Sequence, residues 1–287
     1  MRVRIHRGTR EIGGTCIEVE AYEKRILLDL GLPLTADGPD EALLPHVSGL
    51  DGEDDSLLGC FLSHGHLDHY GLVGLCPKLR LFMGEGACGV LNGAAPFLRD
   101  GVELVCEEFL KHGKVIELGP FRVTSWLVDH SAFDAYCFLI EAEGERIFYS
   151  GDLRGHGRKS SLFEAMVLRD WGEVDLMLLE GTTVGRGPEV VYKSESELED
   201  DFAREFGATE GLALVCTSSQ NIDRIVTIFR AAKRAGRKLI IDVYCNEVLK
   251  ATGYGTVPNA DWDDVFVFVP FRQRLWIRRQ KLFECVR

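Results

Sequence analysis

A cluster of potential metal ligands follows an apolar run near residue 60. The segment SHGHLDH places three of the chain's eight histidines and one aspartate within six residues: His64, His66, Asp68 and His69. Imidazole and carboxylate groups suit Zn²⁺ and, less selectively, Fe²⁺ or Mn²⁺. A loop that leaves a strand end can direct four such side chains toward one point, whereas one helix face cannot hold them all. A polar surface loop is the alternative, and the density of histidines argues against it. We therefore predict a metal site here.

Two more potential ligands stand at the ends of predicted strands. His130 ends the run FRVTSWLVDH, and Asp152 follows IFYSG. A single His or Asp at a strand end is usually structural, but a catalytic site with two metals needs more than four ligands. We therefore interpret both as ligands. Asp29, at the end of ILLDLG, is either a carboxylate that orients the histidine loop or a turn residue.

The elements that must position these residues are mostly hairpins. Alternating and apolar runs predict one hairpin over 15–30, with Glu23 and Lys24 at its turn, and a second over 134–152 around a Glu-Gly turn. The segment LLGCFLS predicts the strand before the histidines, and VDLMLLEG predicts a fully buried strand. Residues 36–56, rich in Asp, Gly and Pro, predict a surface loop.

The pattern changes near residue 190. Ser196 and Glu199 predict a capping box at the start of a helix. A buried strand over 211–218, an amphipathic helix over 221–237 and a buried strand over 238–244 predict a parallel βαβ unit. The run VFVFVP predicts a last strand. We therefore expect two domains, residues 1–192 and residues 193–287.

The composition bounds the classes of function. The 287 residues are 46% hydrophobic with a net charge of −12, which argues against a broad nucleic-acid-coating surface but not against a metal-centred phosphate site. Nine scattered cysteines without a C-x-x-C pair are typical of reduced thiols in the cytoplasm. We expect no signal peptide, because Arg and Glu are scattered through the start of the chain. We expect no membrane span, because no apolar run reaches about 18 residues.

The candidate ligand residues resemble, in their types and order, the motifs of a known superfamily. In order, Asp29, the segment 64–69, His130 and Asp152 resemble the first four motifs of the metallo-β-lactamase superfamily. The resemblance implies an α/β (α+β) fold, the αββα sandwich, with two zinc ions at one edge of its two sheets. It implies that His64, His66 and His130 hold one zinc. It also implies that Asp68 and His69 hold the second zinc, and that Asp152 bridges the two.

A narrower resemblance is to the β-CASP nucleases of the ribonuclease J type. The segments GTREIGGTCIEVE, VDHSAFDAY and LLEGTTVGR are similar to that family, and residues 217–244 are similar to its β-CASP domain. The resemblance implies an RNA-processing phosphodiesterase in which Asp68, Asp152 and Glu180 are catalytic. From position alone, Glu180 is equally a strand-end carboxylate.

The sequence departs from that family at one point. Further histidine motifs, including a last zinc ligand, follow the β-CASP domain in the family, whereas this sequence has no histidine after His156. We therefore expect a partial β-CASP domain, a weak second zinc site and low nuclease activity. We also expect an open sheet edge with a tendency to associate, which would give a homo-oligomer.

Two segments are candidates for binding the substrate. Ser218, Ser219 and Gln220 lie between a predicted strand and a helix N-terminus, where backbone N–H groups suit a phosphate. They are equally an N-cap loop. His156 and Arg158, with the adjacent Lys159, are placed to contact RNA phosphates, and a solvated loop is the alternative.

Three classes of function stay open. The first is a hydrolase that acts on RNA. The second is a thioester or lactone hydrolase on the same sandwich, which would not need the segment after residue 195. The third is a non-catalytic binding protein, which the missing ligand favours and which a metal count separates from the other two.

Overall fold

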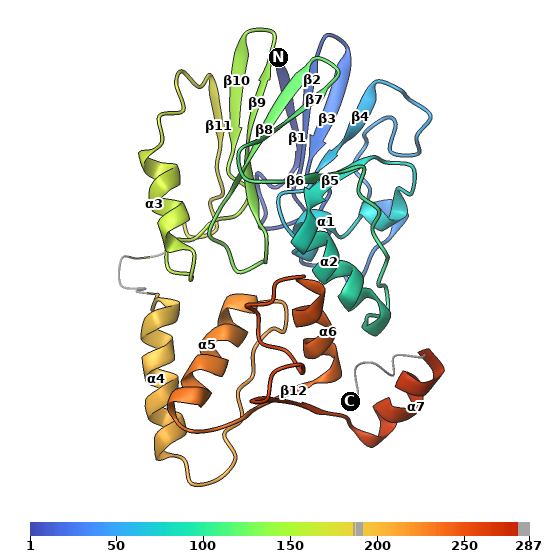
Figure 1. Ribbon diagram of the computed structural model, residues 1–287. Coiled ribbons are helices and arrows are strands. Elements are labelled where there is room, and N and C mark those ends of the chain that lie inside the picture. Colours follow the sequence, from blue (N-terminus) through green and yellow to red (C-terminus); the bar gives the residue numbers. More distant parts are fainter. Residues whose placement is uncertain (186, 188–191, 281–287) are drawn as a thin grey trace.

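Two β-sheets lie face to face in the first 180 residues of the computed structural model, which describes residues 1–185, 187 and 192–280 (Figure 1). In the first sheet the strand order is β1-β2-β3-β4-β5-β6, antiparallel up to β3 and parallel from there on. Its strands are β1 (Arg2–Arg7), β2 (Cys16–Ala21), β3 (Lys24–Leu28), β4 (Leu57–Phe61), β5 (Leu81–Gly84) and β6 (Glu108–Leu110).

The second sheet has the order β11-β10-β9-β8-β7. All of its neighbours are antiparallel except β10 and β11, which are parallel. Its strands are β7 (Lys114–Leu118), β8 (Phe121–Leu127), β9 (Tyr136–Ala142), β10 (Glu145–Tyr149) and β11 (Leu176–Leu178).

An apolar layer joins the sheets, and helices cover their outer faces. Phe61 of the first sheet stacks on Phe82 at 4.6 Å between ring centroids and meets Phe138 of the second sheet edge-on at 5.9 Å. The first sheet's outer side packs against α1 (Leu67–Tyr70) and α2 (Glu85–Ala94), and the second sheet's packs against α3 (Ser160–Leu168). Short 3-10 turns lie at η1 (Glu41–Leu43), η2 (Val73–Leu75) and η3 (Ala95–Phe97). The predicted αββα sandwich is confirmed.

Both predicted hairpins are present. The first pairs β2 with β3, but its turn lies at Tyr22 and Glu23, one residue earlier than predicted, with φ of 47° and 59°. The second pairs β9 with β10 through Glu143 and Gly144, whose φ values of 53° and 78° match the predicted Glu-Gly turn. Such left-handed turns follow the twist of the strands they join.

The strand predicted over VDLMLLEG forms as β11, but the prediction that it is fully buried is wrong. β11 lies at the sheet edge, where Leu176 is 38% and Met177 is 55% exposed. An apolar run has the same sequence pattern whether or not a neighbouring strand covers it. Only the order of strands decided its burial.

The helix α2 (Glu85–Ala94) was not predicted from the sequence. Three glycines, Gly86, Gly89 and Gly93, lower its helix propensity. Two of them serve a close contact, since a Cβ on Gly89 would lie 2.4 Å from the carbonyl oxygen of Ala251, and a Cβ on Gly93 would lie 2.6 Å from the Cβ of Ala251. The glycines therefore let α2 pack closely against the C-terminal part of the chain.

The C-terminal unit, residues 192–280, is mainly helical (Figure 1). Its elements are α4 (Glu195–Ala208), α5 (Ile222–Arg234), β12 (Leu239–Asp242), α6 (Val243–Ala251), β13 (Val265–Phe268) and α7 (Phe271–Gln280). The capping box of α4 uses Ser194 and Glu197, not the predicted Ser196 and Glu199, because Glu199 pairs with Arg158. The α5 helix and both predicted strands that follow it are present.

The buried strand predicted over 211–218 is wrong. The segment has no regular secondary structure, and Leu212 and Leu214 are 74% and 87% exposed. An alternating apolar run becomes a strand only where a free edge meets it in register, and β12 pairs instead with β13. The parallel βαβ unit is therefore formed by β12, α6 and β13. The prediction had placed it in the segment 211–218, the helix now seen as α5, and β12. The division of the chain at residue 192 stays a prediction.

No helix among the described residues is long and apolar enough to cross a membrane. The eight cysteines found there all have free thiols.

Candidate metal centre

The predicted ligands stand on loops that leave strand ends at one edge of the two sheets. Asp29 follows β3 and His64 follows β4, and these strands are parallel neighbours. His130 follows β8, and Asp152 follows β10. Because the strand ends meet at this edge, residues far apart in the sequence come together there.

Four imidazole rings form a tight cluster. The ring of His64 lies at the middle, with centroids 4.8 Å from His66, 4.0 Å from His69 and 4.5 Å from His130. The Nε2 atom of His130 lies 3.1 Å from Nδ1 of His66. Imidazole nitrogens that converge in this way are arranged as ligands are around a metal ion.

Two groups of three ligand atoms share His64. The first comprises His64, His66 and His130, and the second comprises His64, His69 and Asp152, each with its ligand atoms within 4.8 Å of one another. The carboxylate of Asp152 lies 3.4 Å from Nε2 of His69 and 4.0 Å from Nε2 of His64. Asp68 is placed further out, 3.8 Å from Nε2 of His69.

Within the part of the chain that the structure describes, the Nε2 atom of His64 has no hydrogen-bond partner, although the residue is fully buried. Its Nδ1 atom lies 3.0 Å from the hydroxyl oxygen of Ser63, so the unpartnered nitrogen faces the other ligands. Burial, with the neighbouring imidazoles, holds the pKa of His64 well below its ordinary value and lowers the pKa of His130 to about 3. Neutral imidazole is the form that binds a metal, so the donor set fits a divalent cation.

Asp29 orients the cluster through hydrogen bonds to Ser63 and through contact with the ring of His69. It is fully buried, accepts hydrogen bonds from the backbone N–H and hydroxyl of Ser63 at 2.7 and 2.8 Å, and also accepts one from the hydroxyl of Tyr149. Its Oδ2 atom lies 2.7 Å from Nδ1 of His69. Burial opposes a charged ring there, but Asp29 and Asp152 outweigh it and raise the pKa of His69 to about 10. Positive charge is thus favoured beside Nε2 of His69.

A glycine allows the histidine loop to pack against β3. A Cβ on Gly31 would lie 1.8 Å from the carbonyl oxygen of Asp68. Around this contact the backbone N–H groups of Thr15 and Leu30 donate to the carbonyl oxygens of Asp68 and His69 at 3.0 and 2.8 Å. Neither Gly31 nor Ser63 was predicted as a site residue, and the only signal was their closeness in sequence to Asp29 and His64.

Glu180 lies beside the loop of Asp152. Its carboxylate accepts a hydrogen bond from the backbone N–H of Leu153 at 3.0 Å, and its own N–H donates to the hydroxyl of Ser150 at 3.1 Å. The side chain of Glu180 therefore holds the loop of Asp152 by binding the backbone N–H of Leu153.

A largely buried arginine that was not predicted as a site residue joins the ligand loops to the C-terminal unit. The guanidinium of Arg154 pairs with Asp129, which precedes His130, and with Asp223 of α5. Asp129 is fully buried and also accepts from the N–H of Gly157 at 2.7 Å. A Cβ on Gly157 would lie 2.1 Å from Asp129, so the glycine makes room for the pair.

The predicted substrate residues 156 and 158 are used within the chain. Arg158 pairs with Glu199 at 2.7 Å and donates to the hydroxyl of Thr227 at 2.9 Å. His156 stacks on Tyr192 with 5.5 Å between ring centroids, and its carbonyl accepts from the N–H of Glu195 at 3.0 Å. These contacts fasten the loop after Asp152 to α4 and α5.

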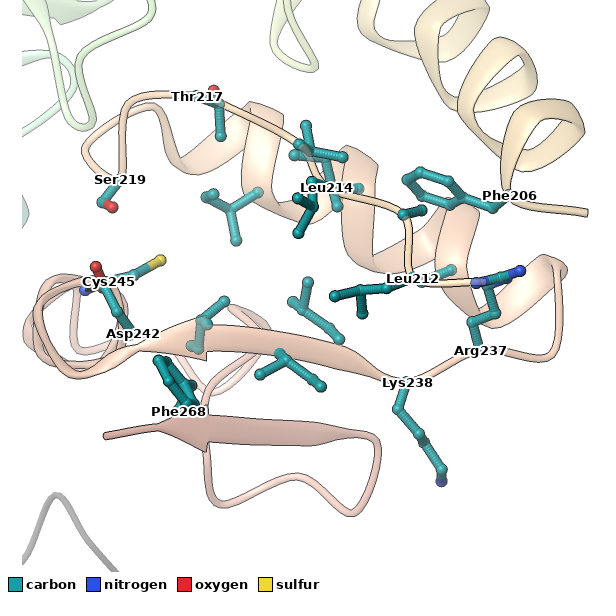
Figure 2. A pocket seen from close by; sticks show the side chains of 18 residues that line it. Phe206, Leu212, Leu214, Thr217, Ser219, Arg237, Lys238, Asp242, Cys245 and Phe268 are labelled. Atoms are coloured by element: carbon teal, nitrogen blue, oxygen red, sulfur yellow. Dashed lines mark hydrogen bonds between the residues drawn. The ribbon is translucent and has the colours of Figure 1, made fainter. Parts of the chain in front are cut away.

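The predicted phosphate loop before α5 makes its hydrogen bonds inside the C-terminal unit. The N–H of Gln220 donates to the hydroxyl of Ser218 at 3.3 Å, and its side chain donates to the hydroxyl of Tyr244 at 3.0 Å. Asn221 caps α5 by accepting from the N–H of Arg224 at 3.2 Å. Ser219 lines an apolar cavity of about 690 Å³ between the segment 212–219, α5 and β12, as Figure 2 shows.

Known proteins resemble this chain in sequence and fold. The family model described as the beta-lactamase superfamily domain matches residues 24–198. Ribonuclease J of Sinorhizobium meliloti is 27% identical over 229 residues, 77% of this chain and 40% of that protein. Ribonuclease J of Mycobacterium tuberculosis is 27% identical over 259 residues, 83% of this chain and 44% of that protein.

The chain thus spans about two-fifths of the length of these curated relatives. A solved protein of unknown function from Enterococcus faecalis V583 aligns with a TM-score of 0.74 and 23% identity, over 94% of this chain and 77% of that one. This likeness shows a shared fold.

Proposed function

The chain belongs to the β-lactamase superfamily, and from this premise we propose that it is a zinc-dependent phosphodiesterase that acts on RNA, as the name of its ribonuclease J relatives implies for them. The observation that carries the proposal is the buried, unpartnered Nε2 atom of His64 at the centre of the ligand cluster. A buried polar atom without a partner is costly in a folded protein, and a bound cation would remove that cost.

We assign the ligands as the resemblance implies. His64, His66 and His130 would hold one zinc ion, Asp68 and His69 a second, and Asp152 would lie between them. When bound, zinc would supply Lewis-acid activation of water and neutralise charge that develops on the phosphoryl group.

The chain's own residues have defined tasks in this proposal. Asp29 would hold His69 so that its Nε2 atom faces the cluster, since its carboxylate lies at the other ring nitrogen. Glu180 would keep Asp152 in place through the N–H of Leu153. Arg154 would fix the two loops that carry His130 and Asp152 against α5.

We also propose that residues 1–192 form the metallo-β-lactamase domain and residues 193–287 a partial β-CASP-like domain. The scattered free thiols support a cytoplasmic location.

Elemental analysis and cleavage assays test the proposal. Protein purified without chelator should contain zinc and cleave single-stranded RNA at a low rate, and EDTA should abolish the cleavage. His66→Ala and Asp68→Ala should lower both metal content and cleavage. His46→Ala is the matched control, because His46 is exposed and lies outside the cluster. A metal-free protein that cannot be reloaded would refute the proposal, and hydrolysis of thioesters or lactones without cleavage of RNA would point to the small-molecule alternative.

A further inference from the structure

The cations near the metal centre differ in how their charge is balanced. Arg154 pairs with Asp129 and Asp223, and Arg158 pairs with Glu199. Arg224, on the facing helix α5, pairs with the buried Glu195. Each of these guanidinium groups therefore already has a carboxylate partner within the chain.

Lys159 is different. It is half-buried at the start of α3, and among the described residues no carboxylate forms an ion pair or hydrogen bond with its ammonium group. Burial lowers its pKa, and the charges of Asp223, Asp129 and Asp134 oppose that shift. A cation partly withdrawn from water without a carboxylate partner raises the energy of the fold, which a bound anion would offset.

The nearest carboxylates are engaged elsewhere. Asp129 and Asp223 hold Arg154, and Asp223 also accepts from the N–H of Arg158 at 3.2 Å. Asp134 accepts from the N–H of Gly86 at 2.8 Å and from the hydroxyl of Tyr136 at 2.8 Å. None of the three is free to turn toward Lys159 without losing these bonds.

Two aromatic side chains complete the surroundings of Lys159. Its ammonium nitrogen lies 5.7 Å from the ring centroid of Phe133, which follows the proposed ligand His130 by three residues. The ring of Tyr254, from the C-terminal unit, meets Phe133 edge-on at 5.5 Å and is 57% exposed. Lys159 and Tyr254 thus both contact Phe133, and a cation and an exposed aromatic ring are the two kinds of group that bind single-stranded nucleic acid.

We propose that Lys159, Phe133 and Tyr254 form a subsite for one nucleotide of a single-stranded nucleic acid, on the loop that follows His130 and on the groups packed against it. Lys159 contacts a phosphate, Tyr254 stacks on the base, and Phe133 supports both. The subsite spans the two-sheet part and the C-terminal unit, so substrate binding joins them. This inference rests on the proposed phosphodiesterase function. It adds the residues over which the nucleic-acid strand passes.

Binding of a cleavage-resistant phosphorothioate oligonucleotide to the metal-loaded protein tests the subsite. Lys159→Gln and Tyr254→Ala should each raise the Kd about tenfold, as loss of one stacked base or phosphate contact does. Lys159→Gln should also reduce the slope of log K against log salt by about 0.7, the value for one phosphate of a single strand. Lys159→Arg and Tyr254→Phe should keep most of the affinity.

The control for charge is Lys238→Gln, which removes an exposed lysine already paired with Asp264. Hydrolysis of bis(p-nitrophenyl) phosphate, which has no neighbouring nucleotide, should be the same in wild type and in Lys238→Gln, and it reports on the metal centre separately from binding of the oligonucleotide. Should Lys159→Gln fail to fold, the exposed Tyr254 still gives the test.

If Lys159→Gln and Tyr254→Ala bind the oligonucleotide as Lys238→Gln does, with an unchanged salt slope, the subsite is wrong. If instead the wild type hydrolyses neither the small phosphodiester nor RNA, the proposed function fails, and the binding data still judge the subsite separately.

Discussion

The carboxylate of Asp29 lies 2.7 Å from Nδ1 of His69, although 40 residues separate them in the sequence. This contact leaves Nε2 of the same ring facing Asp152 at 3.4 Å. A carboxylate that holds the far nitrogen of a ligand histidine fixes both the orientation and the basicity of the ring.

Replacing Asp29 by asparagine should therefore weaken zinc binding by about 10- to 100-fold, the usual effect of losing such a partner. Competition with a chromogenic chelator would measure the affinity. Asp37→Asn, a change in an exposed loop, should leave it unaltered. Equal affinities for the Asp29 variant and the wild type would show that His69 is not a ligand or that Asp29 does not orient it.

Gly31 should tolerate no side chain. A Cβ there would lie 1.8 Å from the carbonyl oxygen of Asp68, so Gly31→Ala must displace the histidine loop. We expect a loss of about 3 kcal/mol or more in the free energy of unfolding, measured with urea, together with a lower zinc content. Gly207→Ala in α4, where nothing lies within 4 Å, should be neutral or stabilising. A Gly31→Ala protein with wild-type stability would contradict the packing of this loop.

Glu195 should make the stability depend on pH. Its side chain is almost fully buried; burial raises its pKa, but hydrogen bonds from Arg224 and Thr227 outweigh this and lower the pKa below the ordinary value. A carboxyl with a depressed folded-state pKa stabilises the protein above the unfolded pKa, and this contribution is lost as the pH falls through the folded pKa.

Glu195→Gln should thus lower the free energy of unfolding by about 1–3 kcal/mol at neutral pH, the range for a lost charged hydrogen bond. The difference from wild type should shrink as the solution is acidified below the ordinary pKa of a glutamate. Urea unfolding at a series of pH values checks this, with the exposed Glu210→Gln as control. A difference that is the same at every pH would show that the charge of Glu195 contributes nothing.

Much of the candidate site could be predicted from local sequence patterns. His64, His66, Asp68 and His69 were found because their spacing alone is improbable for a surface loop. The strand-end positions of His130 and Asp152 indicated two more ligand candidates, which the structure brings to the same cluster. The hairpins were predictable because alternation and turn residues act between neighbours in the chain.

The sequence by itself therefore determined the ligand types and the strands that carry them, since both depend on nearby residues. Only the tertiary structure decided what each side chain meets. It left residues 211–218 without a pairing edge, engaged Arg158 with Glu199, and gave Lys159 no carboxylate partner among the described residues. These outcomes depend on which distant segments pack together, and such contacts leave no periodic pattern in the sequence around either partner.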